Sequence, residues 1–143
     1  MKTIRILVIF LLTAMTLHAQ QNINIPNHPE RKASLQSLRL SIEKELKQPV
    51  KFVVNQLRME KNYAFFSGQV KDAQGKDIDF RKTPYRELVM NDMFDGDATY
   101  ALLKKVKGVW KVVTYVIGPT DVAWGDWPSK YGVSAKLCGF EQP

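Results

Sequence analysis

The residues best suited to chemistry lie near the C-terminus, in the segment GPTDVAWGDWPSKYG, residues 118–132. Two of the three tryptophans of the chain fall there, together with two aspartates and a tyrosine. Indole rings stack on sugar rings or other flat ligands, and carboxylates accept hydrogen bonds from hydroxyl groups. We therefore take as a candidate binding surface for a ligand or partner the following set: Asp121, Trp124, Asp126, Trp127 and Tyr131.

The same segment also has a purely structural interpretation, which we favour. Gly118 and Pro119 cannot continue a strand, so the chain must leave the sheet there. Asp121 and Asp126 stand where they can cap short helical turns, the second ended by Gly132. The two tryptophans would then fold back over the sheet. A pair of carboxylates can also serve a glycosidase, but five residues within a turn fix no separation between them, and we expect no catalytic residue.

A second candidate is a basic and aromatic cluster in the middle of the chain. Arg81 and Arg86, with Lys82 and Tyr85, surround the start of an expected short helix. Backbone N–H groups at a helix N-terminus attract anions, and arginine binds carboxylates and phosphates in a bidentate manner. The cluster could receive an anion, or it could be a solvated charged rim.

Other chemistry finds little support in the sequence. His28 is the only histidine after residue 19, and Cys138 is the only cysteine. Neither has a neighbour at metal-ligand spacing or a partner for nucleophilic catalysis, so we expect no metal and no cofactor. An isolated thiol in an exported protein is either buried or joined to another chain, and we expect burial.

The first 19 residues, MKTIRILVIFLLTAMTLHA, have the pattern of a signal peptide. Lys2 and Arg5 precede an apolar run over residues 6–12, and Ala19 provides a small residue at the cleavage position. The run is well short of the ~20 residues that cross a membrane. We therefore expect a secreted or periplasmic protein, cleaved near Ala19, without a transmembrane anchor.

The net charge indicates the kind of partner. It is +7 for the whole chain, and loss of Lys2 and Arg5 reduces it to +5. This mild excess is spread over the chain, without the basic stripe typical of nucleic-acid-binding proteins. We expect a protein or another envelope component as the partner and no nucleic acid; the oligomeric state stays open.

The elements that position these residues follow from hydrophobic periodicity. Leu35, Leu38, Ile42 and Leu46 recur at helical spacing and predict a helix over residues 30–48. Alternating patterns predict two hairpins, with strands over residues 50–58, 63–71, 97–105 and 109–117. Between the hairpins, Thr83 and Pro84 open a second, short helix that ends near Gly96.

This order predicts an α+β fold. A long N-terminal helix packs on a curved antiparallel sheet of about four strands, and the second short helix lies between the hairpins. Residues 30–143 form a single domain, preceded by the signal peptide (residues 1–19) and a polar, proline-containing and flexible lead-in (residues 20–29).

The closing hairpin, ALLKKVKGVWKVVTYVIG (residues 101–118), resembles the last hairpin of small exported bacterial proteins with a cystatin-like or NTF2-like pattern. The NTF2-like resemblance implies a small enzyme or ligand-binding cone, whose pocket would be lined by Tyr63, Tyr100, Tyr115 and Asp121. The cystatin-like resemblance implies inhibition of a hydrolase through the tip at residues 60–62. The expected strands, however, carry no histidine and no carboxylate within their apolar faces.

The sequence thus favours an exported, non-enzymatic binding or accessory domain. The NTF2-like enzyme or cone and the cystatin-like inhibitor are the alternatives. Exposure of the tryptophan pair would support the binding surface, and an enclosed cavity with converging polar groups would support the cone.

Overall fold

The computed structural model describes residues 19–140. The expected signal peptide, apart from Ala19, lies outside the described residues. Among the helices within residues 19–140, none is both long enough and apolar enough to cross a membrane.

The protein is an α+β fold built on an open, five-stranded antiparallel sheet in which the strands lie side by side in chain order. The helices come before, between and after the long strands. In chain order the elements are β1 (Gln21–Asn22), α1 (Pro29–Leu46), β2 (Val50–Glu60), β3 (Tyr63–Asp72), η1 (Phe80–Lys82), α2 (Arg86–Met90), β4 (Ala98–Val106), β5 (Val109–Ile117) and α3 (Trp127–Tyr131).

The prediction of four strands is wrong, because a fifth strand lies in the segment expected to be a flexible lead-in. β1 pairs with the end of β2, Gln21 opposite Met59 and Asn22 opposite Arg58. The next residue, Ile23, is fully buried and donates its N–H to the carbonyl of Leu57 at 3.0 Å. One anchored apolar side chain thus holds the lead-in to the sheet.

α1 begins one residue before the expected helix and ends two residues earlier, at Leu46. At its start, the Nδ1 atom of His28 accepts a hydrogen bond from the N–H of Glu30 at 3.2 Å, which satisfies one of the free donors of the first turn. At its end, Lys47 adopts a left-handed conformation (φ 56°) that terminates the helix.

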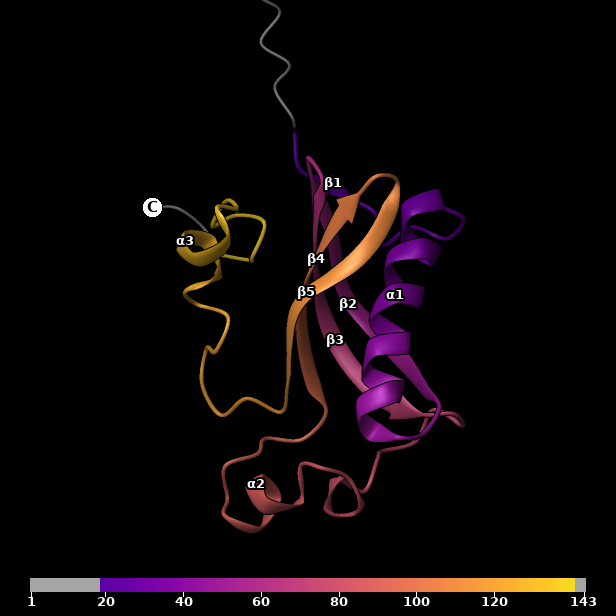
Figure 1. Ribbon diagram of the computed structural model, residues 1–143, viewed down its shortest axis with the longest axis vertical. Coiled ribbons are helices and arrows are strands. Elements are labelled where there is room, and N and C mark those ends of the chain that lie inside the picture. Colours follow the sequence, from indigo (N-terminus) through magenta and orange to yellow (C-terminus); the bar gives the residue numbers. More distant parts are fainter. Residues whose placement is uncertain (1–18, 141–143) are drawn as a thin grey trace, which may run out of the picture.

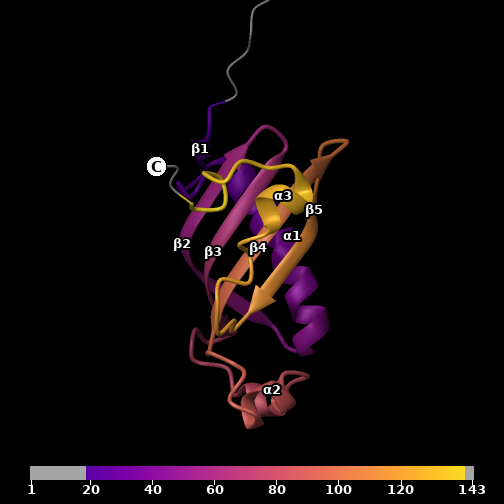
Figure 2. The same ribbon diagram turned by 90° about the vertical axis from the view of Figure 1, so that its left-hand side faces the viewer.

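The sheet is covered on both faces. α1 packs on one face, and the C-terminal segment with α3 packs on the other (Figure 1; Figure 2 views the sheet from the side of α3). The core under α1 includes Leu38, Ile42, Phe66, Leu103 and Trp110. The smaller core under the C-terminal segment consists of Phe65, Leu102, Trp127, Leu137 and Cys138.

The region between the hairpins differs from the expected single helix. It contains the short 3-10 turn η1 and then α2, which ends at Met90 rather than near Gly96. Asp92 has a positive φ of 55°, and the N–H of Met93 turns back to the carbonyl of Leu88 at 2.9 Å. This reversal closes the helix after little more than one turn. α2 lies beyond one end of the sheet (Figure 1).

β5 ends at Ile117, and the chain leaves the sheet at Gly118, as the Gly-Pro pair predicts. Gly118 has a φ of +62°, and a Cβ atom there would lie 2.5 Å from the ring of Phe94. Only glycine fits this combination of conformation and close approach. The turn directs the C-terminal segment onto the face of the sheet opposite α1.

Candidate anion-binding groove

A groove of about 520 Å³ lies between α1 and β2. It exists because α1 is fastened toward the other side of the sheet. The hydroxyl of Ser37 donates to the carbonyl of Trp110 at 2.9 Å, and Glu30 accepts hydrogen bonds from Lys105 and Trp110. With the helix drawn over β4 and β5, part of β2 stays uncovered on the face that α1 occupies.

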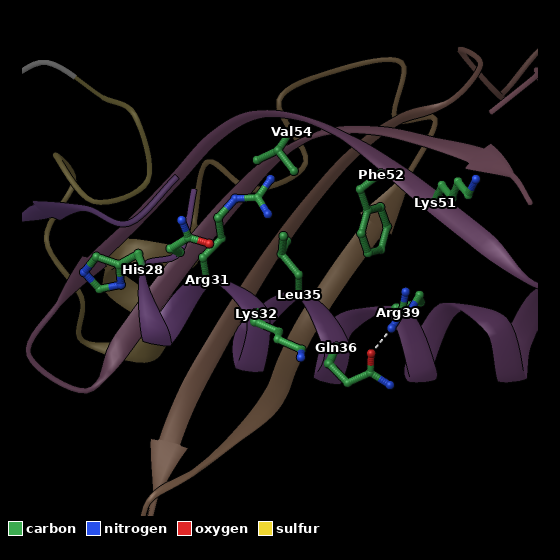
Figure 3. Close-up of a pocket in the computed structure, with 10 residues that line it drawn as sticks. His28, Arg31, Lys32, Leu35, Gln36, Arg39, Lys51, Phe52 and Val54 are labelled. Carbon is green, nitrogen blue, oxygen red and sulfur yellow. Dashed lines mark hydrogen bonds between the residues drawn. The ribbon is translucent and has the colours of Figure 1, made fainter. Parts of the chain in front are cut away.

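One stripe of α1 forms the helical wall of the groove. Arg31, Leu35 and Arg39 recur at intervals of four residues, so their side chains share one side of the helix. The opposing wall consists of Phe52 and Val54 of β2, both half-buried. Figure 3 shows the Arg31 guanidinium extended toward Val54, with Leu35 lying between α1 and β2. The groove therefore combines an apolar floor with a cation toward each end.

The groove is strongly basic. Its lining includes four basic side chains and no carboxylate, the basic residues being Arg31, Lys32, Arg39 and Lys51. Within residues 19–140, none of these four takes part in an ion pair. The two arginines donate side-chain hydrogen bonds to neutral amides: Arg31 to Asn24 at 3.1 Å, and Arg39 to Gln36.

The missing partner of Arg39 has a structural cause. Glu43 lies four residues further along α1, where it could pair with Arg39. Its carboxylate instead accepts a hydrogen bond from the backbone N–H of Val50 at 3.0 Å. Glu43 thus binds the backbone at the beginning of β2, and the guanidinium of Arg39 has no ion pair with it.

This arrangement suits the binding of an anion that also carries apolar groups. Arginine and lysine side chains stabilise anionic groups by hydrogen bonding and charge, and Leu35, Phe52 and Val54 offer apolar surface to the rest of a ligand. The lining residues include no serine, cysteine or carboxylate, and the one imidazole, that of His28, uses its Nδ1 atom to accept a hydrogen bond from the N–H of Glu30. Within residues 19–140, no three metal-ligating side chains gather in one place.

The tryptophan segment lies on the opposite face of the sheet. Trp127, the first residue of α3, is 5% exposed and meets Phe65 edge-on at 6.3 Å between ring centroids. Trp124 is half-buried and stacks on Tyr100 at 3.5 Å. Packing on the sheet accounts for both indoles, as the structural interpretation expects.

The polar residues of that segment do not converge. Asp121 and Asp126 are exposed. Asp126 occupies the N-cap position of α3, but its side chain makes no capping hydrogen bond, so the expected capping role is wrong. Gly132 ends α3 in a left-handed conformation, as predicted. Tyr131 is half-buried beneath Lys130, whose ammonium lies 5.5 Å from the ring centroid.

Two members of the expected basic and aromatic cluster already have partners within the fold. Arg81 forms a two-pronged ion pair with Asp79, at 2.9 and 3.2 Å. Tyr85 packs between aromatic rings rather than facing a ligand, and burial raises its pKa well above the usual range. Arg86, the first residue of α2, is exposed.

The residues expected to line an NTF2-like cone are divided between the two faces of the sheet. Tyr115 lies under α1, where its hydroxyl donates to Glu45. Tyr63 and Tyr100 belong to the cluster under the C-terminal segment, and Asp121 is exposed. These four side chains therefore line no common pocket. The turn between β2 and β3 falls at residues 61–62, and a cystatin-like role for it stays a prediction.

Cys138 is buried (1% exposed) and unpaired, which confirms its expected burial. Burial raises the pKa of the thiol to about 11. The nearby guanidinium of Arg58 acts in the opposite direction. Burial also lowers the pKa of Arg58, whose Nε and Nη2 atoms have no hydrogen-bond partner among the described residues. A buried, protonated thiol does not favour thiolate chemistry.

Sequence reasoning did not find the groove. The spacing of Arg31, Leu35 and Arg39 is visible in the sequence, but the matching wall on β2 depends on the position of α1 on the sheet.

Neither a protein-family model, nor a curated protein, nor a solved structure matches this chain.

Proposed function

We propose that this protein is an exported binding domain whose groove between α1 and β2 captures an anionic ligand. The observation that carries the proposal is the set of four cations around the groove, none of which has an anionic partner among residues 19–140. Export is supported by the positive and apolar pattern of residues 1–19.

Charge and shape support the same class of ligand. Several cations around a partly enclosed apolar surface create a positive potential that attracts anions and is screened by salt. Leu35, Phe52 and Val54 favour a ligand that also carries apolar groups. Carboxylates suit the two arginines because a guanidinium binds them with two parallel hydrogen bonds.

A titration with a simple anionic probe tests this proposal. Fluorescein-labelled hexaglutamate should bind the protein saturably in dilute buffer, as measured by fluorescence anisotropy, and its affinity should fall at least ~10-fold as salt screens the groove. Labelled hexalysine, the control, should not bind. Absence of saturable binding of hexaglutamate at low salt would contradict the proposal.

A further inference from the structure

We infer that the ligand of the groove is an extended acidic peptide segment of another protein, which adds as an antiparallel strand to the free edge of β2. This inference rests on the proposed function and specifies the partner. It starts from the short length of β1, which pairs only with Arg58 and Met59. Beyond the contact of Ile23 with Leu57, no strand within residues 19–140 lies beside the first half of β2.

The hydrogen bonds at the two ends of this edge show which backbone groups it offers. The N–H of Val50 donates to Glu43, and the carbonyl of Val54 accepts from the side chain of Asn24 at 3.5 Å. Both groups therefore point away from β3. Backbone groups of alternate residues point to the same side of a strand, so the N–H and carbonyl of Phe52, midway between them, face the open edge.

The same residue connects the edge to the groove. The side chain of Phe52 lies on the α1 face of the sheet, where it lines the groove opposite the stripe of Arg31, Leu35 and Arg39 (Figure 3). A strand that pairs with Phe52 must therefore run along the groove. Recognition by strand addition combines backbone hydrogen bonds for affinity with alternate side chains for specificity.

The two faces of the added strand meet different surroundings. On the α1 face its side chains approach Arg31 and Arg39, which favour glutamate or aspartate. On the other face they lie beside Lys51 and Val53, which is 48% exposed, and an apolar residue fits against Val53. The edge between Glu43 and Asn24 accommodates about five residues of a partner strand, since each residue rises ~3.4 Å. The expected segment alternates acidic and apolar residues.

Charge argues against a second copy of this chain on the same edge. Pairing of β2 with β2 would bring the exposed Lys51 side chains of both copies onto one strand pair, and like charges across a strand pair are destabilising. An exposed lysine on an edge strand is also a common device against self-pairing. The same basic side chains would attract an acidic partner.

Antiparallel pairing gives the inference a sharp test. In an antiparallel pair, the residue directly opposite Phe52 exchanges both backbone hydrogen bonds with it and has its side chain on the same face. An acidic residue on the α1 face therefore uses its own N–H to bind β2. The N–H groups of the apolar residues point away from β2.

The probe is a fluorescein-labelled peptide of four Glu-Val repeats, used with two backbone-methylated versions. Methylation of the glutamate N–H groups should weaken binding at least ~10-fold, because it removes the hydrogen bonds to the edge. Methylation of the valine N–H groups, the matched control with equal charge and composition, should change the affinity less than ~3-fold. Equal effects of the two methylations, or a larger effect of valine methylation, would overturn the inference.

Amide hydrogen exchange provides an independent readout on the protein. The unmodified peptide should slow exchange of the Phe52 N–H at least ~10-fold and leave that of Val53, which faces β3, unchanged. Protection of Phe52 through a dimer formed without peptide would assign the edge to a second copy and overturn the inference. The outcomes also separate the inference from the proposed function. If the peptide binds in the groove but the glutamate-methylated version binds equally well, strand addition is wrong and the proposed function is unaffected. If neither hexaglutamate nor the unmodified peptide binds, the proposed function itself fails.

Discussion

The carboxylate of Glu43 accepts a hydrogen bond from the backbone N–H of Val50 at 3.0 Å. This one contact ends the free edge of β2 and withdraws Glu43 from Arg39, its neighbour four residues back on α1. The same contact therefore limits the open edge and leaves Arg39 without a carboxylate partner.

Glu43→Gln should strengthen the binding of acidic peptides. Glutamine retains an acceptor for the Val50 N–H but removes a negative charge beside the groove, so we expect a ~2–5-fold tighter Kd for hexaglutamate at low salt. Anisotropy titration measures this change. Glu87→Gln on α2 alters the net charge equally and should leave the Kd unchanged; equal strengthening by both variants would mean that only net charge matters.

Glu30 should make the fold sensitive to acid. Its carboxylate accepts hydrogen bonds from Lys105 at 2.7 Å and from the indole of Trp110, and the hydrogen bond from Lys105 is the main cause of its lowered pKa. A carboxyl group whose pKa is lower in the folded state stabilises the fold above its unfolded pKa, and this contribution is lost as the pH falls through the folded pKa.

Glu30→Gln should therefore lower the free energy of unfolding by about 1.5–3 kcal/mol at neutral pH, a typical value for hydrogen bonds to charged groups. The difference from wild type should shrink as the pH falls below about 4.5, the ordinary value for glutamate. Urea unfolding between neutral and acidic pH measures both effects. A difference that stays constant with pH would show that the ionised carboxylate is not the stabilising form.

The tryptophans of the C-terminal segment should matter for stability rather than for binding. Trp127→Ala should reduce the free energy of unfolding by about 3–5 kcal/mol, as truncation of buried aromatic residues usually does. Trp124→Ala, which removes a half-buried ring stacked on Tyr100, should cost less. Thermal unfolding provides the comparison. Loss of hexaglutamate binding by a folded Trp124→Ala protein would show that this segment takes part in binding.

Cys138 should react slowly with iodoacetamide while the protein is folded. The thiol is 1% exposed, and burial raises its pKa to about 11, so little thiolate forms near neutral pH. Mass spectrometry should find alkylation mainly after urea is added. Rapid labelling of the folded protein would show that the segment around Cys138 opens readily.

Local patterns predict much of the backbone. Strict alternation of apolar residues gives the strands of both hairpins to within two residues, and the Gly118-Pro119 pair gives the exit from β5. β1 escapes prediction because two residues carry no periodicity. Its position depends on burial of Ile23 beneath elements that are distant in the sequence.

The groove escapes prediction for a different reason. The spacing of Arg39 and Glu43 favours an ion pair along the helix, and only the position of Val50 in space shows that Glu43 is used elsewhere. Likewise, Phe52 has the pattern of a core residue, whereas the attachment of α1 to β5 leaves it half-buried at an open edge. The aromatic and acidic residues of segment 118–132 resemble a binding site in the sequence, but packing of the two tryptophans on the sheet explains their presence.

A matched pair of charge reversals tests the basic groove most directly. Arg39→Glu changes a groove residue whose side chain, among residues 19–140, is hydrogen-bonded only to Gln36. Arg86→Glu makes the same change on exposed α2. Both variants should fold with stability close to that of wild type, because each alters a side chain outside the core. In a hexaglutamate titration at low salt, we expect Arg39→Glu to weaken binding at least ~10-fold and Arg86→Glu less than ~2-fold. Equal weakening by the two variants would contradict binding in the groove.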